Sequence, residues 1–170
     1  MKGIAALASL LLSTGILLLG HGMQLTLLPL RAGANGMPES LIGISASFYF
    51  GGFALGCVVI PRIIARAGHI RSFAVLAAIM ISVILCLEML DHWIVWLVLR
   101  CMTGVAISGL YTVIESWLNS QASADSRGRI LATYTFITLV AMAGGQALIN
   151  VGTVETATPF SLAAVFVALA

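Results

Sequence analysis

Five stretches of this sequence are apolar over a length that would cross a lipid bilayer. The hydrocarbon core is about 30 Å thick, and a helix needs about 20 mainly apolar residues to span it. The stretches cover residues 4–30, 38–60, 72–90, 93–117 and 128–150. A sixth begins at Thr158-Pro159 and covers residues 159–170, which is too short to span. The pattern predicts an all-α, polytopic transmembrane helix bundle.

The composition excludes an ordinary soluble domain. Hydrophobic residues make up 61% and charged residues 8% of the 170 residues, and the mean hydropathy is +1.11. Soluble domains contain about 25% charged residues, so these charges could not cover a water-exposed surface of this size. The net charge of +2 gives no reason to expect nucleic acid as a partner. The expected partner is the lipid bilayer.

The basic residues indicate how the spans are oriented. If the spans alternate in direction, one side carries Lys2, Arg62, Arg66, Arg71, Arg127 and Arg129, and the other carries Arg31. Loops rich in Lys and Arg stay in the cytoplasm. The sequence therefore predicts a multi-pass protein of the cell inner (plasma) membrane with a cytoplasmic N-terminus.

Arg100 is the first candidate for function. It lies inside the stretch 93–117, where an arginine at the centre of a span costs about 2.5–3.5 kcal/mol. Helical spacing places Gly104, Ser108, Tyr111 and Glu115 on the same face. This small, polar face is expected to line a solute pathway. The structural alternative is an arginine whose charged end reaches the outer membrane interface.

Other polar residues in the spans are candidates for the same pathway. His21 and Gln24 share a face of the first stretch, and a histidine there could relay protons. A neutral imidazole that only bonds a neighbouring helix is an equal alternative. Thr103 and Thr138 are further candidates, although buried threonines often serve only as interhelical hydrogen-bond partners. Gly52-x-x-x-Gly56, with Gly51 beside it, indicates close helix packing.

The sequence offers no sign of enzyme chemistry. It lacks the HExxH zinc motif, the phosphate-binding P-loop and the GxSxG serine motif. Its three cysteines, Cys57, Cys86 and Cys101, lie inside apolar stretches without CxxC spacing. We therefore expect no catalytic residues, no metal site and no cofactor.

Two local motifs resemble the major facilitator superfamily of transporters. Residues 100–104, RCMTG, are similar to the R-x-x-[QT]-G signature of its fourth helix. Residues 65–71, ARAGHIR, resemble its D-R-x-G-R-R cytoplasmic loop, with Arg66 and Gly68 in place. The acidic position is Ala65, and His69 replaces a basic residue.

Longer segments are similar to the YcaD-like branch of that family, a group of bacterial transporters of uncertain substrate. These segments are residues 111–119, YTVIESWLN, and 127–129, RGR. The resemblance implies twelve helices in two six-helix halves, each built from 3+3 inverted repeats. This chain would be the N-terminal half, truncated within the sixth helix, and the C-terminal half would be missing.

The resemblance also implies a function. The chain would belong to a secondary active transporter that moves a small-molecule substrate by alternating access and is coupled to protons, with Arg100 taking part in the coupling. Glu115 would pair with Arg66 or Arg71 as a cytoplasmic latch. The substrate, the direction, and symport or antiport stay open. The alternative is a non-transporting membrane assembly or sensor protein built on transporter-like helices.

Overall fold

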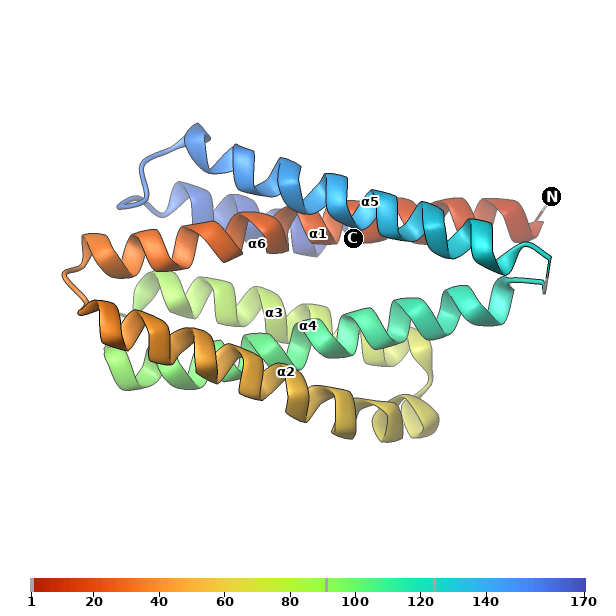
Figure 1. The fold of residues 1–170 in the computed structure, drawn as a ribbon, viewed down its shortest axis with the longest axis horizontal. Helices are drawn as coiled ribbons and strands as arrows, with labels where there is room; N and C mark the ends of the chain where they lie inside the picture. The colour runs from red at the N-terminus through yellow and green to blue at the C-terminus, as the bar shows by residue number, and fades with distance from the viewer. Residues whose placement is uncertain (1, 91, 124) are drawn as a thin grey trace.

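The computed structural model describes residues 2–90, 92–123 and 125–170, except for the side chains of residues 2–6 and 151. The Lys2 side chain, counted above among the basic residues, lies outside the described residues. Figure 1 shows a bundle of helices, in chain order α1 Lys2–Ala34, α2 Glu39–Ala67, α3 His69–Met89, α4 Trp93–Gln121, α5 Arg127–Ala147, the short 3-10 helix η1 Leu148–Val151, and α6 Thr158–Leu169.

The described part of the chain contains five helices that are long and apolar enough to cross a membrane. They correspond to α1 through α5, and the fifth candidate span continues through η1 to Asn150. The apolar helix α6, with 12 residues, is shorter than a span. No strand occurs among the described residues. The predicted all-α transmembrane bundle is confirmed.

The end of α2 differs from the sequence prediction. The predicted stretch 38–60 ends just before Pro61, a residue that usually breaks helices, but α2 continues to Ala67 with Pro61 inside it. A proline removes one backbone donor, and membrane helices tolerate this loss where neighbouring groups satisfy the freed carbonyl. The stop is Gly68, whose φ of 81° suits glycine and whose N–H donates to the Ile64 oxygen at 2.8 Å. Residues 61–71, which separate the second and third predicted stretches, are therefore mostly helical.

Two helix pairs form the body of the bundle. Helix α2 packs along α4, and α1 packs along α5, while α6 lies against α1 and α3 lies against α4 and α6. If the first three helices are matched in order with the last three, α1 corresponds to α4 and α2 to α5. The two main pairs are then equivalent, which is the arrangement that 3+3 repeats would produce.

Glycines bring the helices of each pair into backbone contact. A Cβ atom on Gly52 would overlap the carbonyl group of Cys101, and one on Gly104 would overlap the carbonyl group of Tyr49. The α1–α5 pair has the same kind of contact at two further glycines, Gly22 and Gly145. Small residues at these crossings allow the close approach that stabilises helix pairs in lipid.

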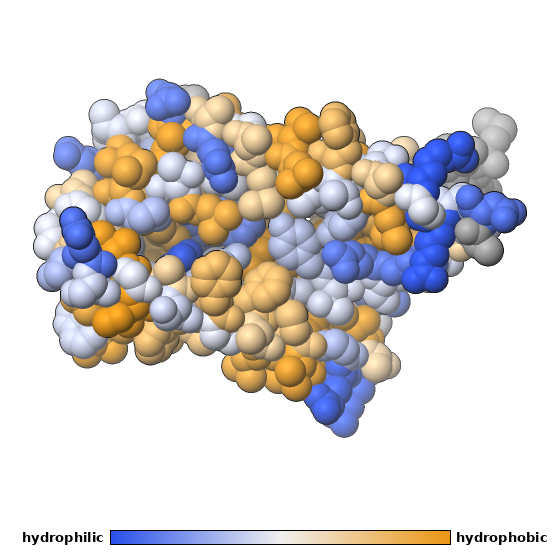
Figure 2. Space-filling model, in the orientation of Figure 1, coloured by the Kyte–Doolittle hydropathy of each residue, from blue (hydrophilic) through white to orange (hydrophobic). Residues whose placement is uncertain are grey.

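The surface is apolar around the middle of the bundle and polar at its ends. Figure 2 shows hydrophobic residues across the middle and hydrophilic residues gathered mainly at the ends. Large apolar side chains are exposed on α2 and α5, among them Phe50 at 67% and Phe136 at 68%. Such a band belongs in lipid or against another apolar helix surface. The N-terminus, the α2–α3 connection and the α4–α5 connection share one end. This is the basic end of the bundle, because Arg62, Arg66, Arg71, Arg127 and Arg129 lie in or beside these connections.

Candidate functional site

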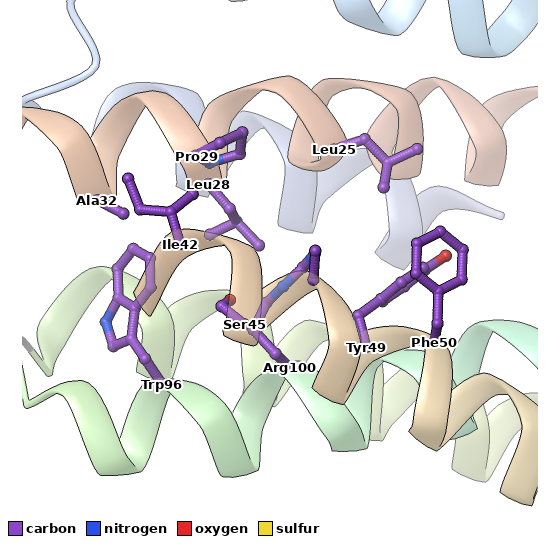
Figure 3. A pocket seen from close by; sticks show the side chains of 11 residues that line it. Leu25, Leu28, Pro29, Ala32, Ile42, Ser45, Tyr49, Phe50, Trp96 and Arg100 are labelled. Carbon is purple, nitrogen blue, oxygen red and sulfur yellow. The ribbon is translucent and has the colours of Figure 1, made fainter. Parts of the chain in front are cut away.

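Arg100 lies inside the bundle rather than at the outer interface. It is on the third turn of α4, and only 7% of its surface is exposed. Its Nη1 atom is buried and has no hydrogen-bond partner among the described residues. The arginine therefore does not snorkel, and its charge points into the space between α4, α2 and α1 (Figure 3).

Tyr49 of α2 is the main neighbour of this charge. The Arg100 Cζ atom lies 4.7 Å from the centre of the Tyr49 ring, a cation–π contact. The Tyr49 hydroxyl lies 3.3 Å from His21 Nε2 of α1, and the two rings stack with centroids 6.2 Å apart. Tyr49 thus links the predicted residues Arg100 and His21. Sequence reasoning missed it, although it is a polar aromatic residue close to the Gly51-Gly52 pair.

A cavity of about 230 Å³ lies beside the arginine. Arg100 and Trp96 reach it from α4, and Ser45 and Tyr49 reach it from α2. The remaining lining is largely apolar and comes from α1 and α2: Leu25, Leu28, Pro29, Ala32, Ile42, Ala46 and Phe50. An apolar pocket with a few convergent polar groups is the usual form of a small-molecule site.

The other predicted residues of α1 and α4 are buried nearby. Gln24 is 1% exposed and lies close enough to His21 to interact with it, but its amide atoms make no well-formed hydrogen bond. Thr103 is fully buried, and its hydroxyl donates to the Leu99 carbonyl of its own helix at 2.8 Å. The Thr103 hydroxyl is thereby occupied in the helix, which favours the packing interpretation for this residue.

A second polar group joins α4 to α5, further toward the end that carries the N-terminus. The Tyr111 hydroxyl donates to the Met142 sulfur at 3.6 Å, and the Tyr134 hydroxyl donates to Glu115 Oε1 at 3.1 Å. Thr138 lies close to Tyr134. Tyr111 stands between Arg100 and Glu115 along α4, so it lies between this group and the Arg100 site. Two predicted residues, Tyr111 and Thr138, therefore belong here rather than beside Arg100.

The predicted latch residues are exposed at the basic end of the bundle. Arg66 lies in the last turn of α2, Arg71 in the first turn of α3, and Glu115 in the second half of α4. Across the described ranges, no ion pair connects Glu115 to either arginine, and its observed partner is Tyr134. The α2–α3 connection instead reaches α4 through His69.

The His69 contact was not foreseen from the sequence. His69 Nε2 lies 2.9 Å from the Ser116 hydroxyl, and its ring lies 6.3 Å from the Trp117 ring. Both partners belong to the segment ESW that follows the polar face of α4. The signal available in the sequence was the histidine that replaces a basic residue in the loop motif.

Metal ligands do not cluster in the described part of the chain. No three His, Cys, Asp or Glu residues there are placed to hold a metal ion, and Cys57, Cys86 and Cys101 are free thiols. The geometry around Arg100 suits the recognition of a solute through charge, aromatic contact and shape.

The known proteins that the chain is similar to are named as uncharacterized MFS-type transporters. The chain is 31% identical over 143 residues to an uncharacterized MFS-type transporter of Enterobacter sp. (strain 638), with 83% of this chain covered. It is 32% identical over 146 residues to one of Yersinia enterocolitica, with 84% covered, and 30% identical over 143 residues to the uncharacterized MFS-type transporter YcaD of Escherichia fergusonii, with 83% covered.

These matches cover only part of each relative. The aligned segment spans 37% of the Enterobacter and Escherichia proteins and 38% of the Yersinia protein. No family model matches the chain, and no solved structure matches it.

Proposed function

The chain belongs to the major facilitator superfamily, and we propose that it supplies the N-terminal half of a secondary transporter that moves a small solute by alternating access. The observation that carries the proposal is the buried guanidinium of Arg100, held against Tyr49 beside a cavity within the span. Placing a charge at this depth in the membrane costs free energy, and such charges normally pair with another group or mark a substrate pathway. Binding of a solute would give the Arg100 guanidinium such a function.

Proton coupling is the finer part of the proposal. His21 is the titratable group joined to Tyr49, on which Arg100 rests. A proton on His21 and a ligand beside Arg100 would each change the electrostatic free energy of the other, because only one aromatic ring separates them. Such reciprocal coupling can connect proton movement to solute binding. Gln24 and Tyr111 extend the proposed pathway toward α1 and α5.

The proposed setting is the inner membrane, with the N-terminus and the basic end in the cytoplasm. Five basic side chains of the described residues support this orientation, since Lys and Arg are retained on the cytoplasmic side. A C-terminal half, proposed from the greater length of the relatives, would cover the other side of the solute path.

The test of the function is reconstitution of the full-length protein in proteoliposomes with an imposed pH gradient. The expected result is accumulation of at least one labelled solute that stops when a protonophore removes the gradient. Movement that reaches only equal concentrations inside and outside would exclude proton coupling. A protein that moves no solute in either direction, over a broad panel, would favour the assembly or sensor function.

The latch is a separate part of the proposal. We propose that Glu115 exchanges partners during transport, between Tyr134 in the present conformation and Arg66 or Arg71 in another. Glu115→Gln removes the charge that the arginines would bind and leaves an oxygen that still accepts from Tyr134. The substitution is expected to change the ratio of inward-open to outward-open protein by about 1.4- to fivefold, since an exposed ion pair contributes roughly 0.2–1 kcal/mol.

Cysteine accessibility from each side of the membrane measures this ratio, in protein whose Cys57, Cys86 and Cys101 have been replaced. Tyr134→Phe is the matched control, because it removes the observed hydrogen bond and leaves the carboxylate free. It should shift the ratio in the opposite direction. Unchanged accessibility in both variants would remove the latch from the proposal without affecting the transport function.

A further inference from the structure

Arg100 is a buried positive charge without a buried negative partner. Among the residues whose burial is described, no other Lys, Arg, Asp or Glu side chain is buried. Among the described residues, the ring of Tyr49 lies against the guanidinium, and Nη1 has no hydrogen-bond acceptor. Glu115 is fifteen residues further along α4, or about 22 Å. An unpaired buried ion costs several kcal/mol, so the site is electrostatically incomplete.

The cavity determines what could complete it. Leu25, Leu28, Ile42 and Trp96 give it apolar and aromatic walls, and Arg100 supplies its only charge. At about 230 Å³ it is far larger than the roughly 10–15 Å³ that a single water needs by the same measure. Its size and lining match a molecule with one charged end and an apolar body.

The sign of the charge selects the ligand class. A carboxylate can accept charge-assisted hydrogen bonds from the guanidinium, and these are stronger than bonds between neutral groups. An amine in the same place would be repelled by Arg100 and would find no carboxylate among the lining residues. A second negative charge on the ligand would have no partner there. The chemistry therefore favours a single carboxylate.

We propose that the solute is an organic monocarboxylate, whose carboxylate binds Arg100 Nη1 and whose apolar or aromatic body lies against Trp96, Leu25 and Leu28. This proposal rests on the proposed transport function and names its substrate class. Tyr49 is a positioning residue in it, since its ring holds the guanidinium and its hydroxyl is held by His21.

Trp96 provides a reporter inside the cavity. In the full-length protein, every tryptophan except Trp96 is replaced by phenylalanine, and the fluorescence of Trp96 is titrated with benzoate. The expected result is a saturable change. Benzylamine, with the same ring and a positive charge, and sodium chloride at equal ionic strength should give no saturable change.

Two substitutions test the site from different directions. Arg100→Gln removes the charge and should weaken benzoate binding at least about tenfold, as expected for the loss of a charge-assisted hydrogen bond. Ser45→Leu keeps the charge but fills the cavity from α2, and should weaken benzoate binding by a similar factor. Ser82→Leu is its matched control on the exposed face of α3, where Ser82 bonds only the Ala78 carbonyl of its own helix. It should leave binding unchanged.

The outcomes separate this inference from the proposed function. Saturable binding of benzylamine, competition by chloride at the affinity of benzoate, or undiminished binding in both Arg100→Gln and Ser45→Leu would overturn the monocarboxylate assignment. So would transport of another solute by a protein that does not bind benzoate, and in that case the transport function would stand. Benzoate bound at Trp96 without any transport would support the site and count against the transport function.

Discussion

Arg100→Ala is expected to reduce transport by the full-length protein to the level of protein-free liposomes while the helix bundle remains inserted. The guanidinium is the only buried charge beside the cavity among the described residues, so no neighbouring group can replace it. Its removal should leave the bundle at least as stable, because an arginine inside a span disfavours insertion by about 2.5–3.5 kcal/mol. Loss of activity with unchanged or raised stability identifies a functional rather than a structural residue.

The measurements are uptake in proteoliposomes and the thermal midpoint in detergent. Arg62→Ala is the matched control, since Arg62 is exposed and its side chain bonds only the Val58 carbonyl of its own helix. That variant should keep transport. Uptake at wild-type rates in Arg100→Ala would exclude Arg100 from the mechanism, and a collapse of the midpoint would show that its contact with Tyr49 is structural.

Gly52→Ala is expected to destabilise the bundle strongly, whereas the same substitution at the adjacent Gly51 is expected to stabilise it slightly. A Cβ atom on Gly52 would overlap the backbone of Cys101 in α4, and backbone cannot rotate away as a side chain can. Overpacking of this kind costs about 1–3 kcal/mol. A Cβ atom on Gly51 meets nothing within 4 Å, so alanine there should gain about 0.5–1 kcal/mol through reduced backbone entropy.

Thermal midpoints of the two full-length variants in the same detergent check this prediction. They should move in opposite directions from the unsubstituted protein. Because Gly104 faces the same crossing, combining Gly52→Ala with Gly104→Ala should add little further loss once the helices have separated. Equal midpoints for Gly51→Ala and Gly52→Ala would mean that α2 and α4 do not cross as described.

Part of this fold could be predicted because it depends on each segment alone. Whether a stretch such as 72–90 enters lipid is decided by its summed hydropathy and length, without reference to its neighbours. The family could be predicted from RCMTG and the segment around Tyr111, and the comparisons confirmed it. The end of α2 could not, because Pro61 is a helix breaker in water and is tolerated within a membrane helix.

The sequence suggested individual residues for the proposed site but not how they are arranged. Arg100 and His21 were chosen because charged and titratable groups are costly within a span. Tyr49 was not chosen, because a tyrosine between two phenylalanines is typical of a residue that only packs against other apolar side chains. Likewise, Glu115 was expected to face arginines at its own end of the bundle, and the structure gives it Tyr134.

The sequence by itself determined that the chain lies in a lipid bilayer, where its helices are, and at which end of the bundle positive charge collects. Each of these follows from the hydropathy or the number of basic residues added up over one segment. Only the tertiary structure decided which faces meet, since the rotation of each helix depends on a few contacts such as Gly52 against Cys101. That rotation puts Tyr49 under Arg100 and opens the cavity beside it. Physically, entry into lipid is a property of one helix, whereas a binding site is a property of helices packed together.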